Sequence, residues 1–415
     1  MKPIVIIGAG QAGLALAAKL RALGCETPIK LIGAEPAPPY QRPPLSKKYM
    51  LGELERARLY LRPEAFYAEN AITLITGTCV AAIEAAEKIV VLDDGTRIAA
   101  SQIALCTGAD PIRLPAAIGG DLAGVYTMRN LADADAMADE FRPGARVLIV
   151  GGGYIGLEAA AVAAAKGLHV TLVEMAPRIL ARVACAETAT WFKALHQSHG
   201  VDIREGVGLS ELTGQDGRVT HARLSDGSEI DVDFVVVGIG VRPGMALAEA
   251  AGLAIENGIR TDAFGATSAP GIWAAGDCAS FPFQGCRIRL ESVPNAIDQA
   301  EAVAAAMLGQ GAPYVAKPWF WSDQFDVKLQ IAGLNTGHDR VIVRQGDKPG
   351  TVSHWYFAGT RLLAVDAMND PRAYMTAKRW IEAGQSPEPA SLADAAIPLK
   401  SVPLAAPQTE LAEAP

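Results

Sequence analysis

The chain has 415 residues, of which half are hydrophobic and one fifth are charged, so it can bury large cores and is expected to form two or three globular domains. Its net charge of −8 gives no sign of the basic face that a nucleic-acid partner requires. No apolar stretch approaches the ~20 residues of a membrane-spanning helix without a glycine or a charge, so no membrane partner is expected.

The cysteines are scattered, with no CxxC motif and no spacing typical of metal ligands. They are Cys25, Cys79, Cys106, Cys185, Cys278 and Cys286. This pattern favours reduced thiols that serve as small buried hydrophobes in a cytoplasmic protein, and it predicts no metal site.

The N-terminal segment has the pattern of a dinucleotide-binding fingerprint. In order, we expect a strand Ile4–Ile7, a turn with Gly8, Gly10 and Gly13, a helix Leu14–Leu23, a strand Ile29–Ile32 and the acid Glu35. The apolar run after Lys2 is also compatible with a secretory signal, but the glycine spacing and the second strand favour the fingerprint.

A proline-rich loop, PPYQRPPLSKKYMLGE, follows between residues 37 and 62. Pro43 and Pro44 fix an extended entry to a short helix, which we expect Ser46 to cap. From composition alone, the flanking cations Arg42 and Lys47 are interpreted as solvated surface residues.

A second fingerprint lies at 146–174. It comprises a strand Val147–Val150, a turn with Gly151, Gly153 and Gly156, a helix to Lys166, a strand His169–Val173 and the acid Glu174. The three glycines permit the turn, the approach of a pyrophosphate and close helix–strand packing, in that order, and the helix N-terminus offers N–H groups to the phosphates. The flanking elements make a fortuitous glycine-rich turn the minor interpretation.

The two regions also resemble each other downstream of their fingerprints. Residues 88–111 and 219–243 both predict a strand, an Asp-Gly hairpin turn (Asp94-Gly95 and Asp226-Gly227), a return strand and a hydrophobic strand ending in a Gly-x-x-Pro turn. This internal duplication predicts two bound dinucleotides.

After Gly240 the sequence predicts a helix through Ala251, a strand Gly271–Ala274 that ends in Ala275-Gly276-Asp277, and a long helix Asn295–Leu308. Asp277 at this turn could cap a helix or accept hydrogen bonds from a ligand's hydroxyls. From Trp319 the pattern changes to strands followed by a helix, Pro371–Ala383, and the Pro- and Ala-rich end is expected to be disordered.

Six separated motifs together resemble one family. They are GAGQAG, PPYQRPPLSK, VGGGYIGLE, IWAAGDCA, ESVPNAIDQA and PWFWSDQF, and they resemble the NADH-dependent, FAD-containing ferredoxin reductases of bacterial cytochrome P-450 and aromatic-ring oxygenase systems. The resemblance implies an α/β fold with two Rossmann-like dinucleotide-binding domains, in a glutathione-reductase-like layout, and a C-terminal α+β domain. The implied parts are an FAD-binding domain (1–109 and 240–316), an NADH-binding domain (110–239), a C-terminal domain (317–402) and a flexible tail (403–415).

The resemblance places FAD on the first fingerprint. The implied FAD contacts are Gly8, Gly10, Ala12 and Gly13 at the pyrophosphate, Glu35 at the ribose, Arg42, Lys47 beside the isoalloxazine, Val80 at the adenine, Thr107, Gly108, Arg129, Gly276, Asp277 at the ribityl chain, Val293 and Trp321. For Trp321 an ordinary core position stays open, because aromatic residues of strand-rich domains usually pack in cores.

NADH is then expected on the second fingerprint. The implied contacts are Gly151, Gly153, Ile155, Gly156, Glu174, Arg182 and Gly240. Glu174 favours NADH over NADPH because a carboxylate repels a 2′-phosphate, although Arg178 and Arg182 nearby weaken that inference.

Glu158 has two interpretations. It is an acid that complements the helix dipole, or it is the family acid that lies near flavin N5 and pairs with the lysine matching Lys47. We predict the second, with Lys47 and Glu158 as the catalytic ion pair that positions the nicotinamide while the cofactors carry the hydride.

The function implied is electron transfer from NADH through FAD to a 2Fe-2S ferredoxin. The sequence has no redox cysteine pair, which disfavours disulfide reductases and NADH oxidases and favours an external acceptor. Rubredoxin reductases and apoptosis-inducing-factor-like signalling proteins remain alternatives, although the latter usually carry targeting segments and a large insertion in the last domain.

An acidic ferredoxin is expected to dock transiently on basic residues of the last domain, with the reductase a monomer or weak dimer. The candidates are Arg340, Arg344, Arg361, Arg372, Lys378 and Arg379.

Overall fold

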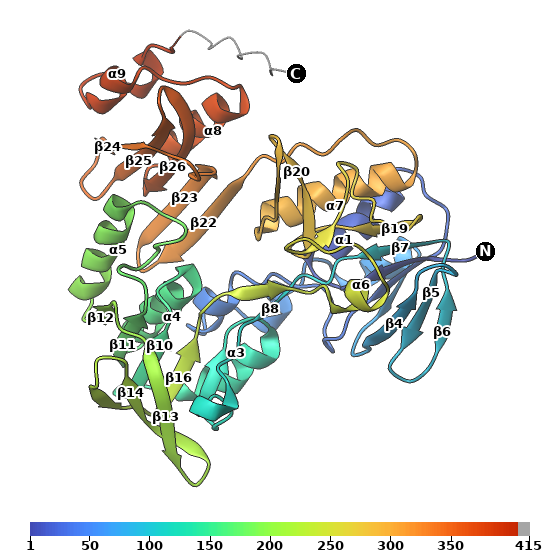
Figure 1. The fold of residues 1–415 in the computed structure, drawn as a ribbon, viewed down its shortest axis with the longest axis horizontal. Helices are drawn as coiled ribbons and strands as arrows, with labels where there is room; N and C mark the ends of the chain where they lie inside the picture. The colour runs from blue at the N-terminus through green and yellow to red at the C-terminus, as the bar shows by residue number, and fades with distance from the viewer. Residues whose placement is uncertain (406–415) are drawn as a thin grey trace. The chain divides into compact units, whose positions relative to one another are not determined.

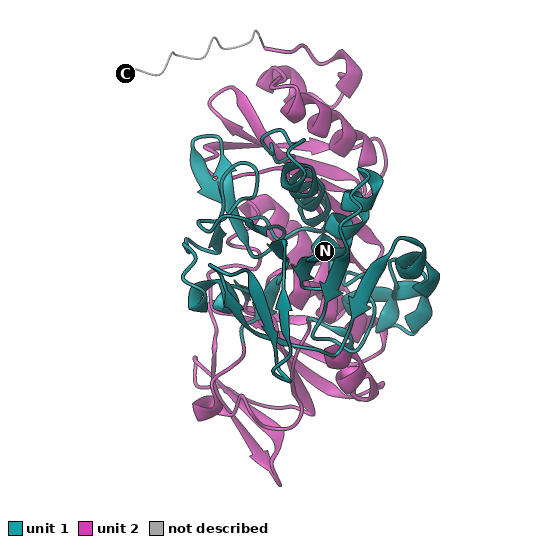
Figure 2. Ribbon diagram, turned by 90° about the vertical axis from the view of Figure 1, so that its right-hand side faces the viewer, with its two compact units in different colours: residues 1–112, 129–131, 241–316 teal, residues 113–128, 132–240, 317–415 magenta. Residues whose placement is uncertain are grey.

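A computed structural model describes residues 1–405, which divide into two compact units (Figure 2). Unit 1 contains residues 1–112, 129–131 and 241–316, and unit 2 contains the remainder of the described chain. Of the predicted tail, residues 406–415 lie outside the described residues, whereas Pro403 and Ala405 make backbone hydrogen bonds with Glu388 and Ser386. Within residues 1–405, every helix is too short or too polar to cross a membrane.

Unit 1 is built on a five-stranded parallel sheet with the order β19-β7-β1-β2-β3. Its strands are β1 (Ile4–Ile7), β2 (Ile29–Ile32), β3 (Ile72–Ile75), β7 (Gln102–Leu105) and β19 (Ile272–Ala274). All four residues of β1 are buried, because a central parallel strand is covered on both faces. Helices α1 (Gln11–Ala22) and α7 (Val293–Met307) pack together on the sheet through Leu16, Leu20 and Val303 (Figure 1).

Smaller elements surround this sheet. They are η1 (Leu45–Tyr49), η2 (Arg56–Leu59), α2 (Glu64–Glu69), β4 (Val80–Glu84), β5 (Ile89–Leu92), β6 (Arg97–Ala99), β8 (Ala109–Pro111), β17 (Val241–Pro243), α6 (Ala246–Ala250), β18 (Ile259–Arg260), β20 (Ala279–Phe283) and β21 (Cys286–Ile288). Strands β4, β5 and β6 form an antiparallel sheet, and β8 pairs antiparallel with β17.

Unit 2 contains a second five-stranded parallel sheet, with the order β12-β11-β10-β16-β9. Its elements are β9 (Val125–Thr127), β10 (Arg146–Val150), β11 (His169–Glu174), β12 (Asp202–Glu205), β16 (Phe234–Val237), α3 (Leu131–Met137), α4 (Tyr154–Ala165), α5 (Ala186–Ser198), η3 (Ala116–Ile118), η4 (Ala138–Glu140) and the antiparallel strands β13 (Leu209–Gln215), β14 (Arg218–Leu224) and β15 (Glu229–Asp231). Helix α4 is rich in alanine, so it packs closely on β10 and β11.

The C-terminal part of unit 2 is an antiparallel sheet with the order β22-β23-β26-β25-β24. Its elements are β22 (Trp319–Gln324), β23 (Val327–Gly333), β24 (Arg340–Gln345), β25 (Val352–Ala358), β26 (Arg361–Met368), α8 (Pro371–Glu382), α9 (Pro389–Ala393) and η5 (Leu399–Ser401). Helix α8 covers β23 and β26 (Figure 1). Trp355 and Phe357 of β25 and Trp380 of α8 are buried in one hydrophobic core. The predicted fold class is confirmed.

The predicted duplication is also visible in the structure. Strands β5, β6, β7 and β8 follow in the same order as β14, β15, β16 and β17. In both hairpin turns the glycine is left-handed, with φ +84° at Gly95 and at Gly227. Asp94 accepts a hydrogen bond from the Thr96 N–H, and Asp226 accepts the equivalent bond from Ser228.

Candidate active site

The first glycine of each fingerprint makes a tight turn at the carboxyl end of a central strand. Gly8 has φ +109° and Gly151 has φ +108°, a region that side-chain-bearing residues rarely adopt. A Cβ would lie 2.1 Å from the Cys106 carbonyl oxygen at Gly8, and 2.4 Å from the Gly238 carbonyl oxygen at Gly151. Both positions therefore require glycine.

The third glycine of each fingerprint allows helix and strand to touch. A Cβ at Gly13 would lie 2.0 Å from the Gly8 oxygen, and a Cβ at Gly156 would lie 2.0 Å from the Gly151 oxygen. By contrast, a Cβ at the middle glycine would meet nothing within 4 Å, at Gly10 or at Gly153. The space in front of each turn is open, as the approach of a pyrophosphate requires.

The helices that follow these turns begin without side-chain caps. Gly10 precedes α1 and Gly153 precedes α4, and neither helix has an acidic residue in its first turn. Their N-terminal N–H groups and positive dipole ends face the open space. Each unit thus has a site whose residues fit the phosphates of one dinucleotide.

In unit 1, several predicted FAD contacts lie together at the carboxyl edge of the sheet. A Cβ on Gly276 would lie 2.9 Å from the Ala12 Cβ, and one on Gly108 would lie 3.5 Å from the Arg129 Nη2. Arg129 in turn forms an ion pair with Asp277 at 3.3 Å. The neighbouring Thr107 donates to the Gly244 carbonyl, which ties this edge to the second Gly-x-x-Pro segment.

Asp277 does not cap a helix. The chain runs from Asp277 into strand β20, and α7 begins at Val293, where the Ser292 hydroxyl caps it by accepting from the Asn295 N–H. Burial raises the pKa of Asp277, and the Arg129 guanidinium opposes that rise. The capping interpretation is therefore wrong, and the predicted contact of Asp277 with the ribityl chain stays a prediction.

Arg42 is not a solvated surface cation. Its guanidinium pairs with Glu35 and donates to the Arg129 carbonyl at 2.9 Å. Tyr40, which the sequence analysis did not identify, donates its hydroxyl to Glu35 and accepts from the Leu131 N–H at 3.0 Å. Burial raises the pKa of Tyr40. The proline-rich loop therefore binds Glu35, the acid that follows the second strand.

Lys47 lies in η1, a single π-helical turn, at a backbone kink with φ −138° and ψ −116°. Its Nζ donates to the Pro43 carbonyl at 3.3 Å. The predicted cap is wrong, because Pro44 precedes the helix and Ser46 is buried inside it. The fixed φ of Pro44 is already helical, so the helix starts two residues earlier than a cap at Ser46 would place it.

Two further predicted FAD contacts, Val80 and Val293, lie at the starts of other elements. Val80 is the first residue of β4 and Val293 is the first residue of α7. Their predicted contacts with FAD stay predictions.

In unit 2, the Glu174 carboxylate folds back to the glycine-rich turn. It accepts hydrogen bonds from the Gly152 N–H and the Ala176 N–H, both at 2.7 Å. Arg178 donates to backbone carbonyls, including that of Ala184 at 2.8 Å. Its guanidinium is thereby committed within the loop, which reduces its value as a partner for a 2′-phosphate. Arg182 and Ile155 are exposed.

Gly240 directly precedes β17 and has φ +109°, close to the values at Gly8 and Gly151. It stands where the second Gly-x-x-Pro segment begins.

Glu158 lies in the interior of unit 2. It is 4% exposed and accepts a hydrogen bond from the Ser322 hydroxyl at 2.7 Å. This burial argues against a solvated acid that only complements the helix dipole. Trp321 lies on the opposite face of β22, half-buried, with its ring 5.7 Å from that of Trp319. Its partial exposure distinguishes it from the fully buried core aromatics.

The cysteines of this chain do not form a disulfide relay. All six lie within the described residues and all are free. Cys106 and Cys278, whose proximity no motif indicated, are both buried, and burial raises both thiol pKa values. A relay requires the opposite, a thiol with a lowered pKa.

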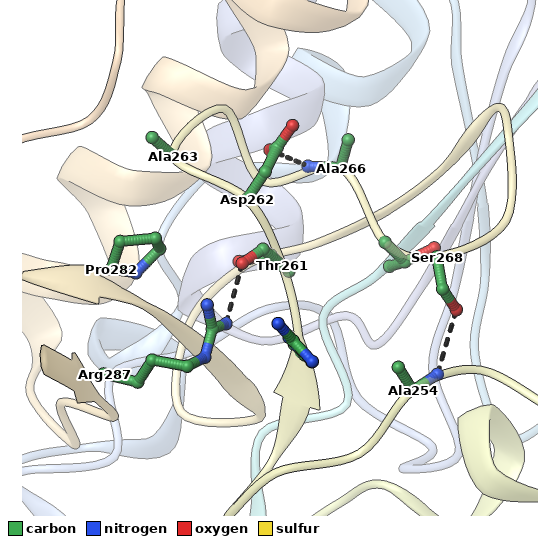
Figure 3. A pocket seen from close by; sticks show the side chains of 10 residues that line it. Ala254, Thr261, Asp262, Ala263, Ala266, Ser268, Pro282 and Arg287 are labelled. Atoms are coloured by element: carbon green, nitrogen blue, oxygen red, sulfur yellow. Dashed lines mark hydrogen bonds between the residues drawn. The ribbon is translucent and has the colours of Figure 1, made fainter.

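A pocket of about 440 Å³ lies elsewhere in unit 1 (Figure 3). The polar groups that line this pocket already form hydrogen bonds with neighbouring residues of unit 1. Arg287 donates to the Thr261 carbonyl at 2.7 Å, Asp262 accepts from the Ala266 N–H, and Ser268 accepts from the Ala254 N–H. These bonds shape the loop and point to no ligand.

The prediction that Arg344 belongs to the docking surface is wrong. Arg344 is 5% exposed and donates to the carbonyls of Leu392, Asp394 and Ile397. It holds the segment after α9 against β24 and presents no charge to a partner. Of the other candidates, Arg372 is exposed beside Asp347.

Comparison with known proteins agrees with this geometry. The family model for pyridine nucleotide-disulphide oxidoreductases matches residues 2–300, and the model for the reductase C-terminal domain matches residues 319–403. The chain is 42% identical to the ferredoxin–NAD(P)(+) reductase fdr of Sphingomonas sp over 402 residues, which are 96% of this chain and 97% of that protein. It is 40% identical to putidaredoxin reductase CamA of Pseudomonas putida over 418 residues, 99% of each chain.

A crystal structure of the covalent putidaredoxin reductase–putidaredoxin complex matches with a TM-score of 0.93 and 40% identity, covering 96% of this chain and 97% of that one. The agreement therefore extends through both glycine-rich sites and the C-terminal sheet. This chain belongs to the pyridine nucleotide-disulphide oxidoreductases, and among them to the ferredoxin reductases that resemble putidaredoxin reductase.

Proposed function

We propose that this protein is an NADH-dependent, FAD-containing reductase that supplies electrons to a 2Fe-2S ferredoxin of a cytochrome P-450 or ring-hydroxylating oxygenase system. The observation that carries the proposal is the pair of glycine-rich turns, one in each unit, each open at its middle glycine and each leading into an uncapped helix. Two sites that fit a dinucleotide, in a chain that belongs to a family of ferredoxin reductases, support one reaction, the transfer of electrons from NADH through FAD.

FAD is assigned to residues 1–109 and 240–316. The turn at Gly8, Gly10 and Gly13 would bind its pyrophosphate through backbone N–H groups, and Glu35 would accept hydrogen bonds from the adenosine ribose. Asp277, held by Arg129, would accept from the ribityl hydroxyls. When bound, FAD accepts two electrons together and releases them one at a time, which a nicotinamide cannot do.

NADH is assigned to residues 110–239, with residues 317–402 as the C-terminal domain. Glu174 lies at the turn that would receive the pyrophosphate, where its carboxylate can accept from the ribose hydroxyls and repel a 2′-phosphate. Because Arg178 is bound to backbone carbonyls, NADH is the better fit.

Lys47 and Glu158 are assigned as the catalytic ion pair. A buried carboxylate is stable only when charge or hydrogen-bond donors compensate it, and Ser322 supplies one donor to Glu158. The pair would orient the nicotinamide, while hydride chemistry belongs to the cofactors.

Electrons would leave for a separate protein, because all six cysteines are free and Cys106 and Cys278 are buried with raised thiol pKa values. The proposed docking surface comprises the basic residues of the C-terminal sheet and α8, namely Arg340, Arg361, Arg372, Lys378 and Arg379. Steering by opposite charge suits a transient complex in which the reductase acts as a monomer or weak dimer.

The test is NADH-driven reduction of cytochrome c by the purified, FAD-loaded protein, with 2Fe-2S ferredoxins and a rubredoxin added separately. We expect stimulation by a ferredoxin. Stimulation by rubredoxin alone would reassign the acceptor, and no stimulation by any electron carrier would favour the signalling alternative.

A further inference from the structure

A chain of buried polar side chains leads away from Glu158 through the interior of unit 2. Ser322 Oγ lies 2.7 Å from Glu158 Oε1, Gln324 Nε2 lies 3.1 Å from Ser322 Oγ, and His196 Nε2 lies 2.8 Å from Gln324 Oε1. Ser322, Gln324 and His196 are fully buried. The chain joins three elements, α4, β22 and α5, which lie side by side in Figure 1.

The carboxylate fixes the direction of every bond in this chain. A carboxylate only accepts, so the Ser322 hydroxyl must donate to it. With its proton used, Ser322 can only accept from the Gln324 amide, and the Gln324 oxygen must then accept from an N–H on His196 Nε2. All three donors therefore point toward Glu158, and their dipoles favour negative charge there.

His196 is held as a neutral imidazole. Burial lowers its pKa to about 4, the bond to Gln324 opposes that shift, and the nearby His199 adds to it. With the proton on Nε2, the Nδ1 atom is an acceptor, and it has no hydrogen-bond partner among residues 1–405. The ring of Phe325 packs against both histidines.

Apolar residues could fill this space without any need for matched hydrogen bonds, and buried polar groups usually stabilise less than well-packed apolar ones. Strand alternation places Ser322 and Gln324 together on the face of β22 opposite Trp321, and this is the face from which Ser322 reaches Glu158.

We propose that Ser322, Gln324 and His196 are positioning residues that hold the Glu158 carboxylate in one orientation for the reaction with NADH. This inference rests on the proposed function, because it assigns to Glu158 its role beside the nicotinamide. It adds three residues whose effect on the reaction passes through Glu158.

The first experiment measures the tautomer of His196 by its ring ¹⁵N chemical shifts in the FAD-loaded protein at pH 7. The chain requires a neutral ring with the proton on Nε2. A proton on Nδ1, or an imidazolium, would overturn the proposal. This result is independent of activity, so an inactive protein with the expected tautomer would contradict the proposed function and leave the chain standing.

The second experiment compares Ser322→Ala with Ser322→Thr and Ser353→Ala. Ser353 is a matched control, because it is fully buried on β25 and its hydroxyl accepts from the Trp355 indole. Ser322→Ala should lower the limiting rate of flavin reduction by about tenfold, with an NADH dissociation constant within about twofold of wild type. Ser322→Thr keeps the hydroxyl and should retain most of the rate.

Gln324→Glu extends the test, because a carboxylate at 324 would accept from Ser322 and draw its proton away from Glu158. It should slow flavin reduction at least as much as Ser322→Ala. Equal rates for Ser322→Ala and Ser353→Ala would overturn the proposal, as would a loss confined to NADH affinity.

Discussion

Glu174 and Gly152 are joined by a hydrogen bond of 2.7 Å from the Gly152 N–H to the carboxylate. The acid at the end of β11 therefore reaches back to the glycine-rich turn at the end of β10. This contact places a negative charge beside the turn that we assign to NADH.

Replacing Glu174 with alanine should lower the ratio of kcat/KM for NADH to that for NADPH by about tenfold, because it removes the repulsion of a 2′-phosphate. Steady-state kinetics with both nucleotides measure this ratio. Glu205→Ala is the control, since Glu205 is paired with Glu174 across β11 and β12 and also accepts from a backbone N–H. An unchanged ratio in Glu174→Ala would remove Glu174 from specificity.

The glycines give a second prediction. Gly10→Ala adds a methyl group to open space and should fold normally, but it should weaken FAD binding by tenfold or more, at ~1.4 kcal/mol per tenfold. Gly13→Ala places its Cβ 2.0 Å from the Gly8 oxygen and should destabilise unit 1 itself. Thermal unfolding of the FAD-free proteins separates the two effects. Equal stability of the two variants would contradict the packing role of Gly13.

The proposed docking surface predicts a salt-dependent defect. Neutralising Arg361, Arg372 and Arg379 together should slow ferredoxin reduction several-fold at low ionic strength, while reduction of ferricyanide is unchanged. The matched control neutralises Arg97 and Arg223, exposed arginines on antiparallel sheets elsewhere in the chain. Equal losses with both acceptors would point to damage at the flavin.

Asp366 predicts a pH dependence of stability. Burial raises its pKa from 3.8 to about 6, although Tyr356 and Thr188 donate hydrogen bonds to it. Because the pKa of Asp366 is higher in the folded than in the unfolded protein, its contribution to the free energy of unfolding is greatest below pH 4 and is lost as the pH rises through 6.

Relative to Asp366→Asn, the wild type should therefore lose about 2 kcal/mol of unfolding free energy between pH 4 and pH 7. Denaturant unfolding at several pH values measures the difference. A flat difference for Asp366→Asn would show that burial does not perturb this carboxyl.

Local patterns in the sequence predicted the two sheets and the glycine-rich turns well. Strands β1 and β2 were predicted with their observed bounds, because each is a short, largely apolar run that ends at a glycine and is confined to a few adjacent residues. The two Asp-Gly hairpins of the duplication were predicted for the same reason, because the signal for each turn lies in a few adjacent residues. The Reductase C-terminal match and the solved relative agree with the predicted strand-rich last domain.

Contacts between distant residues could not be predicted in this way. The sequence shows the charge of Arg344 but not the carbonyls some 50 residues later that bind it. Tyr40 and the Ser322–Gln324–His196 chain were missed for the same reason, since each partner lies on a different element. A polar residue at a buried strand position, such as Ser322 or Gln324, is the one signal that alternation alone offers.

The most direct test of the account is anaerobic stopped-flow mixing of the FAD-loaded protein with NADH and then with an oxidised 2Fe-2S ferredoxin. We expect NADH to bleach the flavin absorbance, and ferredoxin to restore it with two ferredoxin molecules reduced per NADH. A flavin that NADH does not reduce, or a reduced flavin that ferredoxin does not reoxidise, would contradict the central claim.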